Sequence, residues 1–155
     1  MPGDDLGQFQ VSAALSSSDC GPEALGTTDL WEFEVRLSRD GADLFWLNGA
    51  EVIAGSLAAD GVSFSFDTLL EFEIEPPNPP HSGCTVLRRD RAEGSLSSAD
   101  LDAEGFAASL SYHYAAGEGS DCSGLVGVQG GFASLPCEIG YLLDGHREQP
   151  TTPQD

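Results

Sequence analysis

Lysine is absent from this chain of 155 residues, so all six of its basic side chains are arginines. Against them stand 26 aspartates and glutamates, and the formal net charge is -20. A surface this acidic repels nucleic-acid phosphates and anionic lipid headgroups, which argues against a nucleic-acid-binding protein. Cationic partners, divalent cations and simple solubility in a salty medium are all compatible with the charge. Arginine without lysine is also what a high-GC genome produces, and we expect a bacterial source.

Long apolar runs and helical periodicity are missing as well. No run approaches the roughly 20 apolar residues that a membrane-spanning helix needs, so we predict no membrane span. The apolar fraction of 40% is nevertheless that of a folded protein, and the length is that of one domain. We predict a single domain at residues 7–145, between a flexible N-terminus at 1–6 and a disordered tail at 146–155.

The chain also lacks the paired C-x-x-C motifs that zinc ribbons and thioredoxin-like sites require. Its four cysteines are isolated from one another: Cys20, Cys84, Cys122 and Cys137. Most of them lie in glycine-flanked loop sequences, and an even number of cysteines in turn-rich surroundings predicts two disulfides. We predict that Cys122 pairs with Cys137, because the turn-rich segment between them can fold back as a loop. Cys20 and Cys84 then remain for the second disulfide.

Two disulfides indicate an oxidising compartment and therefore export. The chain begins "MPGDDLGQF", which has neither the basic nor the apolar region of a signal peptide. We expect that a signal segment has been removed and that the protein is extracytoplasmic. The sequence does not choose among a secreted, a periplasmic and a lipid-anchored surface protein.

The clearest positive feature of the sequence is an apolar pattern of period two. In "LWEFEVRL", residues 30–37, apolar residues alternate with charged ones, which places one face of a strand in a core and the other in water. The pattern predicts eight strands, at residues 7–15, 30–38, 43–48, 51–58, 62–74, 84–90, 106–115 and 132–144. Leu69 breaks the alternation of the fifth strand, where we predict a bend or a bulge.

Short connections join many of these strands. Asp40-Gly41 and Asp60-Gly61 are hairpin signals, because such turns need a positive φ that glycine adopts easily. The segment 76–83, "PPNPPHSG", is a surface connection, since proline lacks the N–H that a strand ladder requires. We therefore predict an all-β antiparallel domain. A meander-type barrel is preferred over a two-sheet sandwich, because closure removes unprotected strand edges.

The segment Asp100-x-Asp102-x-Glu104-Gly105 resembles the first half of an EF-hand calcium loop. The twelfth position of such a loop is a bidentate glutamate, but here it is Ser111, and we expect no flanking helices. We interpret the segment as a hairpin connection and expect no cofactor. A weak calcium site formed by Asp100, Asp102 and Glu104 is the alternative.

The aromatic residues suggest two interpretations of the barrel interior. Eight-stranded barrels either fill with side chains or hold one small ligand. We predict a solid core. The alternative is a cavity for an apolar ligand, with an aromatic lining drawn from Trp31, Phe33, Trp46, Phe64, Phe66, Phe72, Tyr112 and Tyr141.

A catalytic constellation is not visible. There is no G-x-S-x-G nucleophile elbow. Glu71, Glu73 and Glu75 alternate with apolar residues, so we expect them on a solvated face, with a cation-binding stripe as the alternative. The only cluster of positive charge, formed by residues 88, 89 and 91, is expected to pair with neighbouring acids.

These patterns predict an exported, acidic, disulfide-stabilised binding or structural module that is not an enzyme. One alternative is a carrier barrel for a small apolar ligand. Another is a hydrolase whose site is assembled from scattered carboxylates. The expected partner is cationic, or is a protein or glycan that docks on an exposed aromatic patch. The sequence does not determine the oligomeric state.

Overall fold

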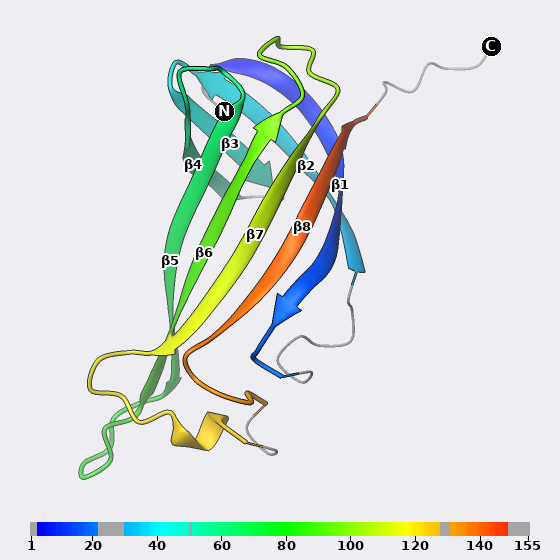
Figure 1. Ribbon diagram of the computed structural model, residues 1–155. Coiled ribbons are helices and arrows are strands. Elements are labelled where there is room, and N and C mark those ends of the chain that lie inside the picture. Colours follow the sequence, from blue (N-terminus) through cyan, green and yellow to red (C-terminus); the bar gives the residue numbers. More distant parts are fainter. Residues whose placement is uncertain (1–2, 22–29, 50, 128–130, 149–155) are drawn as a thin grey trace, which may run out of the picture.

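The computed structural model describes residues 3–21, 30–49, 51–127 and 131–148. Eight antiparallel strands form a closed barrel, in which each strand pairs with the next along the chain and β8 pairs with β1 (Figure 1). The all-β meander barrel is therefore confirmed, in preference to the two-sheet sandwich. The helical element in the described residues is one 3-10 turn, η2, at Ser123–Leu125. In that same part of the chain, no helix has the length and apolar character needed to cross a membrane.

Every predicted strand has a counterpart in the barrel. The strands are β1 Asp4–Ser18, β2 Leu30–Asp40, β3 Asp43–Asn48, β4 Glu51–Leu57, β5 Ser63–Glu75, β6 Cys84–Leu96, β7 Gly105–Ala116 and β8 Cys137–Arg147. β6 continues past residue 90, because Ala92 and Gly94 extend its inward-facing alternation with side chains too small to give an apolar signal. β8 begins at Cys137 rather than at residue 132.

Strand pairing extends further toward both ends of the chain than the predicted domain 7–145. Asp4 pairs with Arg39 of β2, and Arg147 pairs with Phe9 of β1. The rest of the predicted tail, from residue 149, lies outside the described residues, as do residues 1 and 2 of the predicted flexible N-terminus.

The expected bend or bulge at Leu69 is not formed. β5 pairs with β6 without interruption there, and the irregularity in register lies between Glu73 and Glu75. Leu69 breaks the sequence pattern for another reason: its side chain belongs to the outer face of the barrel and is 58% exposed. An apolar residue on the outer face of a strand interrupts the alternation in the sequence, but it does not require any irregularity of the backbone.

The hairpin turns form where glycine was expected to allow them. Gly41 and Gly61 have φ values of 62° and 76°. Beside Gly61, one carboxylate oxygen of Asp60 accepts hydrogen bonds from the backbone N–H groups of Val62 and Ser63, at 2.9 and 2.8 Å. The Ser63 hydroxyl and these N–H groups favour the ionised carboxylate, and they hold the pKa of Asp60 below its usual value.

Side chains fill the upper half of the barrel, the end at which β2 turns into β3 and β6 continues toward β7. Phe9 is fully buried, and its ring meets that of Phe106 edge-on at 5.7 Å between centroids. Phe64 and Trp46 contact the same Phe106 ring at 6.0 and 5.7 Å. Edge-to-face contacts of this kind stabilise a packed core beyond the burial of apolar area alone.

The connection at residues 97–104 closes this upper end. Ala103 is 2% exposed, and its carbonyl accepts a hydrogen bond of 2.9 Å from Arg147 Nε. Arg147 Nη2 donates to the carbonyl of Leu101, also at 2.9 Å, and the guanidinium lies 5.2 Å from the centre of the Phe9 ring. One arginine of β8 therefore attaches the connection to the core.

We expect Arg147→Ala to lower the free energy of unfolding by about 1.5–3 kcal/mol, because a hydrogen bond from a charged donor to the partly buried carbonyl of Ala103 is lost, together with the exposed one to Leu101. The matched control is Arg36→Ala. Arg36 forms an ion pair with Asp5 in which the two side chains are 43% and 59% exposed, so its loss should cost less than about 1 kcal/mol. Urea denaturation measures both values. Equal losses would show that Arg147 does not anchor the connection.

The four cysteines form two disulfides, as predicted, but the predicted pairing is wrong. The bonds are Cys20–Cys137 and Cys84–Cys122, with Cα–Cα distances of 5.1 and 4.9 Å. Cys20 follows β1 and Cys137 begins β8, so closure of the barrel brings them together. Cys84 begins β6 and Cys122 follows the adjacent β7. The prediction assumed that cysteines close together in the sequence form the bond. The pairing of the strands decides instead which cysteines are close together in space.

Non-reducing peptide mapping distinguishes the two pairings. Trypsin has only arginines to cut after, so Cys122 and Cys137 stay together in one fragment, residues 92–147. We expect this fragment to be linked to both the fragment of Cys20 and the fragment of Cys84. A second cleavage after Phe132 should then leave Cys20 attached to the Cys137 side. A direct link between the fragments of Cys20 and Cys84 would contradict the structure.

The third and fourth strands are too short to complete the barrel wall along its whole length. β3 and β4 have 6 and 7 residues, whereas each other strand has 11 to 15. β3 pairs with β2 only over Arg36–Asp40, and β4 pairs with β5 only at Ser56–Ser65 and Leu57–Phe64. Below the β3–β4 hairpin, therefore, no described strand lies between β2 and β5.

Candidate functional site

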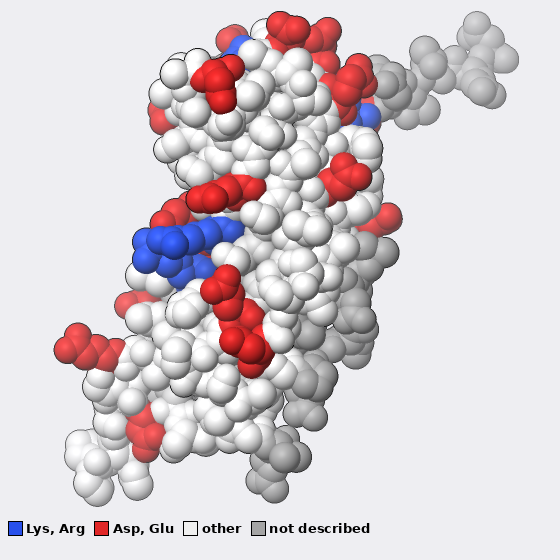
Figure 2. Space-filling view, in the orientation of Figure 1, with Lys and Arg blue, Asp and Glu red and all other residues white. Residues whose placement is uncertain are grey.

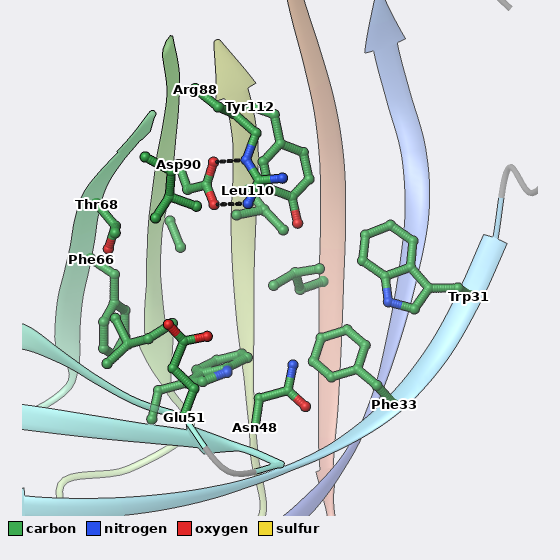
Figure 3. A pocket seen from close by; sticks show the side chains of 15 residues that line it. Trp31, Phe33, Asn48, Glu51, Phe66, Thr68, Arg88, Asp90, Leu110 and Tyr112 are labelled. Carbon is green, nitrogen blue, oxygen red and sulfur yellow. Dashed lines mark hydrogen bonds and ion pairs between the residues drawn. The ribbon is translucent and has the colours of Figure 1, made fainter. Parts of the chain in front are cut away.

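The lower half of the barrel contains a cavity of about 280 Å³, so the expected solid core is found only in the upper half. Inward-facing residues of seven strands line it: Trp31, Phe33, Trp46, Asn48, Glu51, Ile53, Phe66, Thr68, Leu70, Arg88, Asp90, Ala92, Leu110, Tyr112 and Leu143. The cavity lies where the short β3–β4 hairpin stops, and the two lining residues at the ends of that hairpin, Asn48 and Glu51, are exposed (Figure 3). The site is therefore accessible from solvent.

Aromatic rings form one wall of the cavity. Trp31 and Phe33 of β2 stack with their centroids 5.8 Å apart, and Trp46 of β3 lies 6.1 Å from Phe33. Phe66 of β5 continues the series at 5.8 Å from Trp46. Trp31, Phe33 and Trp46 are only half-buried, although they face the interior, so part of each aromatic surface is uncovered. Uncovered apolar surface inside a barrel is available to a ligand.

A row of polar side chains forms another wall. Thr68, Asp90 and Tyr112 are cross-strand neighbours on β5, β6 and β7, so their side chains stand side by side on the inner face. Arg88 precedes Asp90 by one inward-facing position. Its Nε and Nη2 atoms donate to the two carboxylate oxygens of Asp90, at 2.7 and 2.8 Å. Figure 3 shows this ion pair on the opposite side of the cavity from Trp31.

Aromatic rings hold the guanidinium of Arg88 in place. Its central carbon lies 4.9 Å from the centre of the Tyr112 ring and 5.4 Å from that of Phe72. Burial opposes the charged form, but the hydrogen bond and the charge of Asp90 outweigh it and raise the pKa of Arg88. A planar guanidinium suits both a bidentate carboxylate and an aromatic face, so Arg88 is a rigid part of the wall.

Burial, followed by the negative charge of Asp90, raises the pKa of Tyr112 to about 12. The phenol is therefore neutral at every physiological pH. Its hydroxyl can both donate and accept a hydrogen bond within the cavity.

The structure distributes the sequence-predicted aromatic residues over three positions. The cavity lining includes Trp31, Phe33, Trp46, Phe66 and Tyr112. Phe64 and Tyr141 belong to the buried core beside it, where the Tyr141 ring meets Trp31 at 4.5 Å. Phe72 is 40% exposed and contacts the cavity through Arg88.

Sequence reasoning missed the inward direction of the ion pair. The basic residues 88, 89 and 91 were expected to pair with neighbouring acids. Arg89 and Arg91 do so on the outer face, where both contact Asp67. Arg88, however, shares the phase of Cys84 and Val86, which are buried. That phase was a readable signal, but it is overlooked when every charged residue is assigned to solvent.

The resemblance to a calcium loop is not accompanied by a cluster of ligands. Three carboxylates of the β6–β7 connection are exposed: Asp100, Asp102 and Glu104. Among the described residues, the potential metal ligands that come together are Asp19, Cys20 and Cys137. The two sulfurs of that group form a disulfide, and metal binding requires thiolates.

No family model, no curated protein sequence and no solved structure matches this chain. The inference of a function therefore rests on the cavity. Its geometry combines an uncovered aromatic surface, an internal ion pair and an exposed rim.

The raised pKa of Tyr112 predicts a pH dependence. An unfolded tyrosine loses its proton near pH 10, whereas folded Tyr112 keeps its proton to about pH 12. Between these values the folded state binds more protons, so rising pH favours unfolding, and the stabilisation present below pH 10 is lost. We expect the unfolding free energy to fall less steeply above pH 10 in Tyr112→Phe than in the wild type. Absorbance titration should show a pKa near 12 that this variant lacks; identical titrations would refute the assignment.

Proposed function

We propose that this protein is an exported binding module that holds one small, uncharged and mainly apolar molecule in the cavity of its barrel. The observation that carries the proposal is the half-buried aromatic wall of Trp31, Phe33 and Trp46, which faces the interior and which other side chains cover only in part. The volume of about 280 Å³ is at the lower end of the range of small-molecule sites, roughly 300–1,000 Å³, so the ligand is small.

The charge of the cavity and of the whole protein argues against an anionic ligand. Asp90 already neutralises Arg88 through two short hydrogen bonds, so an anionic ligand would have to compete with a carboxylate that is held in place. The net charge of -20 also repels an anion before it reaches the rim. Arg88 uses two of its five N–H donors on Asp90, and the remaining donors can bind a single acceptor, such as a carbonyl or an ether oxygen.

Binding without catalysis fits the same arrangement. The buried carboxylate of the cavity, Asp90, is not free to act as a general base, because both of its oxygens accept hydrogen bonds from Arg88. The other carboxylate of the lining, Glu51, is exposed at the rim. The outward-facing Glu71, Glu73 and Glu75 are exposed, which is unlike the buried acid that a glycosidase requires. The disulfides Cys20–Cys137 and Cys84–Cys122 support an oxidising, extracytoplasmic location.

Two fluorescent probes with the same ring skeleton test the proposal: neutral N-phenyl-1-naphthylamine and its anionic sulfonate, 1-anilinonaphthalene-8-sulfonate. We expect one neutral probe to bind per protein, at least about tenfold more tightly than the anionic probe. The two tryptophans of the chain, Trp31 and Trp46, both line the cavity, so binding should quench the intrinsic fluorescence. Absence of neutral-probe binding, or equal affinity for the two probes, would overturn the proposal.

Adjacent residues of β4 provide a matched pair of variants. Ile53 lines the cavity, whereas Val52 faces outward and is 48% exposed. Ile53→Trp should fill the site and lower the affinity for the neutral probe at least about tenfold, while Val52→Trp should leave it unchanged. Probe fluorescence is the measurement, and a similar loss in both variants would place the probe outside the cavity.

A change of charge at Asp90 should reverse the preference between the probes. Asp90→Asn leaves the guanidinium of Arg88 without its carboxylate partner, so we expect the anionic probe to bind more tightly than it does to the wild type. Asp67→Asn is the control, because Asp67 pairs with Arg89 on the outer face. An unchanged preference in Asp90→Asn would show that the ion pair does not select the ligand.

A further inference from the structure

Beyond Ser65, β5 has a hydrogen-bonded strand partner on one side only, among the described residues. β4 pairs with β5 at Ser65 and Phe64, and no described strand continues this pairing along residues 66–75. On its other side the same segment pairs with β6 over almost its full length. Alternate residues of 66–75 therefore direct their backbone N–H and C=O groups toward solvent, where they can accept another strand.

Apolar side chains are exposed along this free edge. Leu69 is 58% exposed on the outer face, and Phe72 and Ile74 are 40% and 52% exposed on the inner face. Proteins protect free edges with charged side chains, proline, bulges or a short strand. Residues 66–73 contain no proline, and the register irregularity comes only after Glu73, so the protection along this edge is acidic charge. Negative charge opposes pairing with another acidic strand, but it does not oppose the addition of a basic one.

The charges along the edge point to the chemistry of the added strand. Glu71, Glu73 and Glu75 are exposed on the outer face, and none of them forms an ion pair with a described residue. All six arginines contact other groups, namely Asp5, Asp90, Asp67 or the backbone carbonyls of the β6–β7 connection. Two of them already neutralise Asp67 at the upper end of the edge, so its uncompensated charge is that of the three glutamates. On the face seen in Figure 2, the main patch of basic atoms is confined to the middle of the barrel.

A second copy of this edge does not fit the charges. Antiparallel pairing of this edge with itself, centred on Glu71 so that apolar residues stay on the inner face, sets Glu71 opposite Glu71 and Asp67 opposite Glu75 of the other copy. Like charges directly opposite one another destabilise a strand pair. A strand with basic residues at alternate positions avoids this repulsion and gains attraction instead.

We propose that the free edge of β5 at residues 66–75 binds an extended segment of another protein, in which basic and apolar residues alternate. The backbone of the segment adds to the sheet beside β5. Its basic side chains lie next to Glu71, Glu73 and Glu75, and its apolar side chains cover Phe72 and Ile74 on the inner face. The added strand lies beside the opening of the cavity, because Phe66, Thr68 and Leu70 of the same segment line it, but its binding does not require a ligand in the cavity.

A peptide of alternating arginine and valine tests this proposal on the intact, oxidised protein by fluorescence polarisation. Glu71→Gln combined with Glu73→Gln should weaken binding at least about tenfold. The control is Asp102→Asn combined with Glu104→Gln, which removes the same charge at the opposite end of the barrel and should have little effect. Equal losses in the two double variants would show that only the net charge attracts the peptide, and would overturn the proposal.

The backbone hydrogen bonds between the peptide and β5 need a separate measurement. A peptide of the same sequence, N-methylated along one edge, keeps its charges but loses donors, so it should bind at least about tenfold more weakly. Hydrogen exchange should show new protection at alternate amides of residues 66–75. Undiminished binding of the methylated peptide, or protection elsewhere, would contradict strand addition.

Discussion

The pairing of β1 with β8 is the interaction on which the rest of this structure depends. It joins the two ends of the chain, so each strand of the upper barrel has a neighbour on both sides and the inward faces of all strands meet in one core. It also brings Cys20 beside Cys137, and the resulting disulfide locks the closure covalently across a sequence separation of 117. In a chain with a net charge of -20, this covalent bond opposes the mutual repulsion of the surface.

Several of the few arginines stabilise the fold. Arg147 attaches the β6–β7 connection to the upper core, and Arg89 and Arg91 neutralise Asp67 on the outer wall. Arg88 is the exception, because it faces the interior and forms with Asp90 a neutral pair inside the cavity. A charge inside a barrel destabilises the fold unless a partner of opposite charge pairs with it, and Asp90 is that partner for Arg88. The pair makes this wall of the cavity polar, so this wall can select a ligand by its polar groups.

The short β3–β4 hairpin produces both of the proposed binding sites. Because β3 and β4 have only 6 and 7 residues, they complete the wall above and leave β2 and β5 apart below. The same shortness leaves the aromatic rings of β2 partly uncovered and the edge of β5 without a described partner. The cavity and the free edge are thus two consequences of one feature, yet they present different surfaces: the cavity wall carries the neutral pair of Arg88 and Asp90, and the edge carries exposed glutamates.

Local physical chemistry allowed the sequence by itself to determine the strands, their alternation, the turns at Gly41 and Gly61 and the presence of two disulfides. Side-chain alternation and positive φ are properties of neighbouring residues, so they are legible without a fold. Only the tertiary structure decided which cysteines pair and that the interior is hollow below the hairpin. Each of these depends on contacts between strands distant in sequence or on the relative lengths of neighbouring strands, and no local pattern encodes how a barrel closes.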